Sequence, residues 1–182
     1  MSRMDDVKSD LKYCGEGVLI YPWAKIVNRD KIEMGDYCQI DDFSFVNGGL
    51  GLKMGKYVHI GSLAAIIGAG TCTMGDCAAL CAGAKILTSS NIYDEAWSMS
   101  DVSPEMLLRY KTGHVEVGAF AFIGVNSVVY PDVEIGEGAV IGALSFVNKD
   151  VEPWSINVGS PCRKIKDRPK PSYPVPEEFG IG

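Results

Sequence analysis

Three segments spaced 20 residues apart decide the fold: Met34-Gly35-Asp36-Tyr37, Met54-Gly55-Lys56-Tyr57 and Met74-Gly75-Asp76-Cys77. A similar segment, Cys14-Gly15-Glu16-Gly17, lies 20 residues before the first. Outward from these segments, an apolar residue recurs at steps of six, six and eight, and after a gap at steps of six alone. The 18 positions are Cys14, Ile20, Ile26, Met34, Ile40, Val46, Met54, Ile60, Ile66, Met74, Leu80, Ile86, Val117, Ile123, Val129, Ile135, Ile141 and Val147.

This repeat predicts a triangular coil. Glycine follows nine of the 18 positions, and the fourth residue after each is small except at Asp30 and Leu50. Neither the period of 3.6 of a helix nor the period of two of a long strand gives such a pattern. A period of six fits a coil whose three sides are short strands and whose corners are tight turns that favour glycine. We therefore expect an all-β solenoid with three parallel sheets.

Composition restricts the class of protein. The chain has 182 residues, of which 47% are hydrophobic, and this suits one globular domain. Its net charge of −6 argues against a nucleic-acid-binding surface. No apolar run reaches the roughly 18 residues of a membrane span. Residues 1–12 lack the apolar core of a secretory signal, so we expect a cytoplasmic protein.

The cysteines do not predict a metal site. Six are present, but no Cys-x-x-Cys pair occurs, and the only histidines are His59 and His114. No zinc-binding spacing matches this arrangement, so we expect no metal and interpret the cysteines as reduced, small apolar residues.

Two interruptions of the repeat are candidate functional segments. A long excursion covers about residues 88–116, some 23 residues more than a coil needs, with one helical turn expected after Ser103. The repeat stops at Pro153 and Pro161, and a basic cluster follows that favours an anionic ligand. Its members are Arg163, Lys164, Lys166 and Arg168, and Lys149 lies just before Pro153. We expect one domain over residues 1–168 and an extended proline-rich tail over 169–182.

Apolar side chains at outward positions indicate self-association. Phe43, Phe45, Phe120, Phe122, Leu144 and Phe146 fall on odd offsets from the inward positions. Exposed together, they would form an apolar patch, and a symmetric oligomer would cover it.

The repeat resembles that of the hexapeptide-repeat acyltransferases over about residues 14–165. This resemblance implies a left-handed parallel β-helix. We expect six coils, which start at Cys14, Met34, Met54, Met74, Val117 and Ile135. It also implies a homotrimer with ligand sites between neighbouring prisms. Handedness follows from the resemblance, since period alone does not give it.

Local motifs are similar to those of bacterial N-acyltransferases acting on nucleotide-linked 4-amino-4,6-dideoxy sugars, and of related sugar O-acetyltransferases. These motifs include Ile40-Asp41-Asp42-Phe43, Tyr57-Val58-His59-Ile60, Ser89-Ser90-Asn91-Ile92-Tyr93-Asp94 and Gly159-Ser160-Pro161-Cys162-Arg163. The resemblance implies acetyl-CoA or another acyl-CoA as co-substrate, and a role in the synthesis of cell-surface polysaccharide such as lipopolysaccharide O-antigen.

The resemblance also implies candidate site residues. Coenzyme A would pass Gly124, Val125, Gly142 and Ala143, where free backbone N–H groups and small residues allow close approach, and then Asn148; Lys149, Arg163 and Lys166 would meet its phosphates. The sugar would contact the excursion at Asn91, Tyr93, Asp94 and Glu95.

His59 is the preferred general base, because Ala79 one coil above leaves room beside it and a neutral imidazole accepts a proton near pH 7. His114 is interpreted instead as a loop-closing residue. An alternative mechanism needs no base. A neutral amine would attack, the departing thiolate would take the proton, and Asp94 and Glu95 would hold the amine.

Other functions also remain open. A sugar hydroxyl is the second acceptor, and a non-catalytic scaffold subunit is the third interpretation. A γ-class carbonic anhydrase is excluded, since its zinc needs three histidines and the chain has two.

Overall fold

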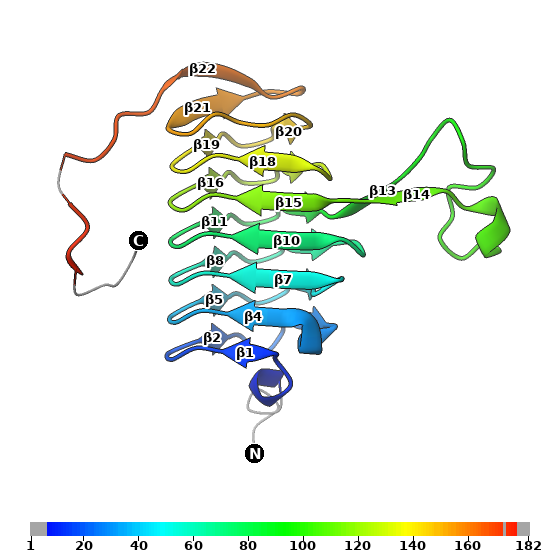
Figure 1. Ribbon diagram of the computed structural model, residues 1–182, viewed down its shortest axis with the longest axis horizontal. Coiled ribbons are helices and arrows are strands. Elements are labelled where there is room, and N and C mark those ends of the chain that lie inside the picture. The colour runs from blue at the N-terminus through cyan, green and yellow to red at the C-terminus, as the bar shows by residue number, and fades with distance from the viewer. Residues whose placement is uncertain (1–6, 173, 178–182) are drawn as a thin grey trace.

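Three parallel sheets form the three sides of a prism in the computed structural model, which describes residues 7–172 and 174–177. Our expectations for residues 1–6, 173 and 178–182 therefore lie outside the described residues. In Figure 1 the front strands run from right to left while the chain climbs and returns behind, so the coil is left-handed. The structure confirms the predicted left-handed parallel β-helix.

Each coil contributes one strand to each sheet. Sheet A contains β1 (Tyr13–Cys14), β4 (Ile32–Met34), β7 (Gly51–Met54), β10 (Thr71–Met74), β15 (His114–Val117) and β18 (Val133–Ile135). Sheet B contains β2 (Leu19–Ile20), β5 (Gln39–Ile40), β8 (His59–Ile60), β11 (Ala79–Leu80), β16 (Phe122–Ile123), β19 (Val140–Ile141), β21 (Ser155–Val158) and β22 (Arg163–Asp167). Sheet C contains β3 (Lys25–Val27), β6 (Phe45–Asn47), β9 (Ala65–Ile67), β12 (Lys85–Leu87), β17 (Val128–Val129) and β20 (Phe146–Val147).

The predicted inward residues stack in register from coil to coil. In sheet A, Met34 pairs with Met54, Met54 with Met74, and Met74 with Val117. The columns that contain Ile60 in sheet B and Ile66 in sheet C align in the same way. This register confirms the six predicted coils. Beyond them, β21 extends sheet B and β22 pairs with it antiparallel, which ends the parallel repeat.

One part of the inward pattern was wrong. Asp30 and Leu50, the two exceptions to the small position four residues after an inward residue, have exposed side chains. The two extra residues at this corner move the inward position to Ile32, Leu52 and Cys72, each two residues before the next methionine. Side chains of a strand alternate between faces, so a residue two places before a buried one is buried too.

The excursion forms an arm, here residues 89–112, that projects from the corner between sheets C and A (Figure 1). Its base is an antiparallel pair of strands, β13 (Ser89–Asn91) and β14 (Tyr110–Thr112). The helical turn expected after Ser103 is present as a 3-10 turn, η2 (Glu105–Leu107), directly after Pro104. A second 3-10 turn, η1 (Arg29–Lys31), lies at the same corner of the first coil. Since β15 starts at His114, the excursion is shorter than predicted.

All six cysteines are free thiols. Cys38 and Cys72 are buried, and burial raises the pKa of Cys38 to about 11 and that of Cys72 to about 12. Within residues 7–172 and 174–177, no group of three or more metal-ligating side chains occurs. No helix in the described part of the chain is long and apolar enough to cross a bilayer.

Two leucines in one turn test the corrected inward position. Leu52 is 2% exposed and Leu50 is 71% exposed. Leu52→Ala should destabilise the protein by about 2–5 kcal/mol, because it leaves a cavity in the core. Leu50→Ala should change stability by less than about 1 kcal/mol. Denaturant unfolding of both variants measures the difference, and equal losses would contradict the assignment.

Candidate active site

His59 and Asp41 form a contact on the outer face of sheet B. His59 Nε2 lies 3.0 Å from Asp41 Oδ2, and Gln39 Nε2 donates to the other oxygen of Asp41 at 2.7 Å. Register explains the meeting, because Gln39 and His59 are paired residues of β5 and β8 and Asp41 follows β5 directly. The His59 side chain is 45% exposed and that of Asp41 is 22% exposed, so solvent or a ligand reaches the pair.

The ionised carboxylate of Asp41 orients the imidazole. Burial alone would raise the pKa of Asp41, but hydrogen bonds from Gln39 and His59 outweigh it and hold the pKa below its ordinary value. An ionised Asp41 accepts a hydrogen bond from Nε2–H of a neutral His59, which leaves the lone pair on Nδ1. The predicted base therefore has a defined accepting atom. Ala79 pairs with His59 one coil above, as expected, and adds little bulk there.

The base of the arm borders a cavity of about 290 Å³. Predicted substrate residues Asn91, Tyr93 and Asp94 line it, whereas Glu95 does not. Sequence reasoning missed two other lining residues, Lys111 and Tyr130. The Tyr130 hydroxyl contacts that of Ser90 and lies 3.0 Å from that of Tyr93. The cavity thus brings a carboxylate, an ammonium group and three hydroxyls together.

Asp132 anchors the arm to the prism. Its carboxylate pairs with Lys111 and accepts the backbone N–H of His114 at 3.1 Å. The hydrogen bond from Lys111 is the main reason that the pKa of Asp132 lies below its usual value. His114 Nδ1 lies 2.8 Å from Thr71 Oγ1 at the same place, where the arm returns to sheet A.

The predicted coenzyme A path follows the corner between sheets B and C. Val125 and Ala143 are exposed there. The expectation of free N–H groups was wrong for the two glycines. Gly124 donates to Ile141 O and Gly142 to Asn157 O, both at 2.8 Å, because these amides join successive coils.

The basic cluster divides into paired and unpaired cations. Lys149 and Arg163 line a cavity of about 310 Å³, and Asn148 and Lys166 are exposed outside it. Among the described residues, Lys149, Arg163 and Lys166 form no ion pair. Lys164 instead contacts Glu152 and Asp167, each at 2.7 Å, and these contacts raise its pKa. The three cations predicted to meet phosphate thus have no carboxylate partner, and Arg168, the remaining member of the cluster, donates to backbone carbonyls instead.

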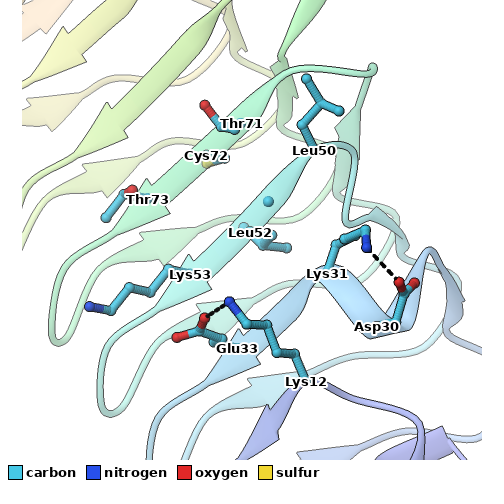
Figure 2. Close-up of a pocket in the computed structure, with 11 residues that line it drawn as sticks. Lys12, Asp30, Lys31, Glu33, Leu50, Leu52, Lys53, Thr71, Cys72 and Thr73 are labelled. Carbon is cyan, nitrogen blue, oxygen red and sulfur yellow. Dashed lines mark ion pairs between the residues drawn. The ribbon is translucent and has the colours of Figure 1, made fainter.

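A groove of about 330 Å³ on sheet A contains none of the predicted site residues (Figure 2). Lys12 contacts Glu33 at 2.5 Å, and Lys31 contacts Asp30 at 2.8 Å. These ion pairs therefore neutralise much of the charge in this groove.

The candidate residues lie in separate parts of one chain. His59 lies on sheet B and Asp94 on the arm beyond sheets C and A, whereas Lys149 follows β20 and Arg163 begins β22, the last strand of sheet B. Asp41 was missed as a partner of His59. Its only signal was a charged residue at a position where glycine is frequent, 18 residues before the histidine.

Comparison with known proteins gives consistent results. Residues 114–149 match the family model described as bacterial transferase hexapeptide (six repeats). The chain is 34% identical over 174 residues to dTDP-4-amino-4,6-dideoxy-D-glucose acyltransferase from Escherichia coli, covering 93% of this chain and 91% of that protein.

Two solved structures of AntD, an N-acyltransferase from Bacillus cereus, are each 32% identical to the chain. One, a single-substitution variant with dTDP-4-amino-4,6-dideoxyglucose and coenzyme A, has a TM-score of 0.86 and covers 93% of this chain and 91% of that one. The other, with dTDP and 3-hydroxybutyryl-CoA, has a TM-score of 0.85 and covers 93% and 89%.

The anchoring of the arm is testable through Asp132. Asp132→Asn removes the charge that Lys111 contacts but keeps an oxygen for the N–H of His114. Hydrogen exchange of the β13–β14 amides should accelerate about 2–5-fold at pH 7, since an exposed ion pair contributes up to about 1 kcal/mol. Asp150→Asn is the matched control, because Asp150 accepts the N–H of Glu134 one coil above, away from the arm.

The same pair predicts a pH dependence. The pKa of Asp132 is lowered in the folded state, so the stabilisation is complete above the ordinary carboxyl pKa of about 3.9. This stabilisation is lost as the pH falls through the lower pKa that Asp132 has in the folded protein. The hydrogen-exchange rate of the arm amides in the wild type should therefore approach the rate in Asp132→Asn, measured at the same pH, only in strong acid. An arm of equal mobility in both proteins at pH 7 would contradict the anchor.

Proposed function

This chain belongs to the hexapeptide-repeat family of bacterial transferases, and we propose that it acylates the amino group of a nucleotide-linked 4-amino-4,6-dideoxy sugar with an acyl-CoA. The observation that carries the proposal is the similarity over nine-tenths of the chain to an enzyme named for that substrate. AntD, which is similar over the same length, binds both coenzyme A and the dTDP-linked amino sugar. We place the reaction in the cytoplasm, within synthesis of cell-surface polysaccharide such as O-antigen.

His59 is the proposed general base. The neutral amine attacks the thioester carbonyl carbon, an amide C–N bond forms, and the C–S bond breaks. His59 Nδ1 takes the proton from nitrogen while Nε2 remains hydrogen-bonded to Asp41. The proton then passes to the departing thiolate, which leaves as the free thiol of coenzyme A. Asp94, on the arm, is proposed to hold the amine.

The proposed coenzyme site lies along Gly124, Val125, Gly142, Ala143 and Asn148. Exposed side chains at Val125 and Ala143 mark a surface open to the pantetheine chain. Lys149, Arg163 and Lys166 are proposed to bind its phosphates, since no carboxylate within the described residues neutralises them. Lys164 is left out of the set because two carboxylates already hold it.

A homotrimer is proposed to assemble the site. Four apolar side chains line the corner between sheets B and C: Trp23, Phe43, Leu63 and Leu144, which are 63%, 62%, 64% and 72% exposed. A neighbouring subunit would cover this row. Trimer formation would also bring the arm of one subunit to sheet B of the next, and so join Asp94 to the His59–Asp41 pair that one chain holds apart.

Substitution of His59 tests the base. Thiol release is measured with acetyl-CoA and 3-hydroxybutyryl-CoA against dTDP-4-amino-4,6-dideoxyglucose, other nucleotide-linked amino sugars and plain sugars. His59→Asn should reduce kcat at least 100-fold, and Asp41→Asn should reduce it less, because it misorients the base without removing it.

His114→Asn is the matched control and should retain activity. A loss below about tenfold in His59→Asn would favour proton transfer to the thiolate, in which His59 only orients the sugar. Acylation of plain sugars but not of amino sugars would contradict the proposed acceptor.

Charge at the apolar corner tests the trimer. Sedimentation should give three times the chain mass of 19.6 kDa for the wild type. Leu63→Glu should dissociate the trimer and abolish thiol release, because it buries an unpaired charge. Leu50→Glu, at a leucine of similar exposure on another corner, should leave both unchanged. A fully active monomer would refute the shared site.

A further inference from the structure

A further cavity lies at the corner between sheets A and B and contains none of the residues proposed above for catalysis, sugar binding or coenzyme binding. It measures about 370 Å³, within the range of ligand pockets. Phe120 and Trp154 form its aromatic walls, and Arg168, Lys170 and Val175 of the C-terminal segment close its outer side. Figure 1 shows this segment turning back along the prism after β22.

A glycine in an aromatic column fixes the position of the Trp154 ring. Backbone hydrogen bonds join the turns of Phe120, Gly138 and Trp154 in three successive coils. A Cβ at Gly138 would lie 2.6 Å from the Trp154 ring, and its φ of +63° favours glycine as well. The indole of Trp154 therefore packs on the backbone of Gly138, and the cavity lies beside the indole, where Phe120 and Glu137 also line it.

The C-terminal segment brings positive charge to this hollow. Arg168 Nη1 donates to Phe120 O at 3.1 Å and to Gly138 O at 2.8 Å, which holds the segment on two coils. Arg168 and Lys170 lie 5.5 and 5.4 Å from the centre of the Trp154 ring. Glu137 is the only carboxylate among the described lining residues, so the cations are in excess.

The indole N–H of Trp154 adds an unused donor. It is buried and has no hydrogen-bond partner among the residues that the structure describes. A buried donor without an acceptor costs about 1–3 kcal/mol, so a small movement of the indole that let a ligand supply an acceptor would be favoured.

From these features we propose that the pocket of Phe120, Trp154, Arg168 and Lys170 binds the base and phosphate of a nucleotide. Aromatic walls suit the ring, the two cations suit the phosphate, and the indole N–H suits an acceptor on either. The inference rests on the proposed function, whose two substrates both carry a nucleotide. The coenzyme ends in an adenosine 3′-phosphate and the sugar in a nucleoside diphosphate.

Trp154 itself serves as the reporter. The chain has three tryptophans, and Trp23→Phe with Trp97→Phe leaves only Trp154. Fluorescence of this full-length variant is titrated with adenosine 3′,5′-bisphosphate in one arm and with dTDP in the other. Saturable quenching by adenosine 3′,5′-bisphosphate identifies the coenzyme as the source of the bound nucleotide. Saturable quenching by dTDP identifies the sugar substrate as its source.

Charge reversal separates this pocket from general electrostatic attraction. Lys170→Glu should raise the Kd of the nucleotide that quenches Trp154 at least fivefold. Lys53→Glu, at an exposed lysine on sheet A, should leave this Kd unchanged. No quenching by either nucleotide at millimolar concentration, or equal affinity in Lys170→Glu, would overturn the inference.

Thiol release by the wild-type protein, in which Trp23 keeps its place in the apolar row, separates the two proposals. Turnover without a Trp154 response refutes the pocket and leaves the proposed function standing. Absence of turnover across the substrate panel refutes the proposed function, whatever the fluorescence shows.

Discussion

The stacking of inward apolar residues from one coil onto the next is the constraint on which the whole structure depends. Met34, Met54 and Met74 are paired in register, as are Ile40 and Ile60. Strands in a sheet lie about 4.8 Å apart, so each side chain covers the one below and excludes water from the prism. A slip of one residue would turn every inward side chain to solvent. Insertions are therefore confined to corners, and the arm arises at one of them.

A rigid prism places functional groups by register on its outer faces. His59 meets Asp41 because their strands are neighbours in sheet B and the two residues are offset by two positions. The arm, by contrast, depends on a small number of contacts at its base, chiefly those of Asp132 with Lys111 and His114. A stable scaffold thus carries a less firmly held element that bears the proposed amine-binding carboxylate, Asp94. This division suits an enzyme that must admit a large sugar nucleotide.

Sequence reasoning identified much of the candidate site and missed contacts between distant segments. It selected His59, since a lone histidine beside a small residue is visible in the repeat. It did not find that Asp41 orients His59, or that Tyr130 and Lys111 border the cavity of the arm. It treated Lys164 and Arg168 as members of one basic cluster, whereas carboxylates hold the first and backbone carbonyls the second. Local charge density does not reveal which cations already have partners.

The sequence by itself determined the three-sided coil, the six turns and nearly all inward residues, because burial repeats with a short period along the chain. The displaced corner at Leu50 and Leu52 was the exception, since two extra residues shift the alternation there. Only the tertiary structure decided which polar groups pair, where cavities open and that the proposed catalytic residues lie on different faces. Those features depend on contacts between side chains of separate coils and of the returning C-terminal segment, and no periodicity in one dimension encodes them.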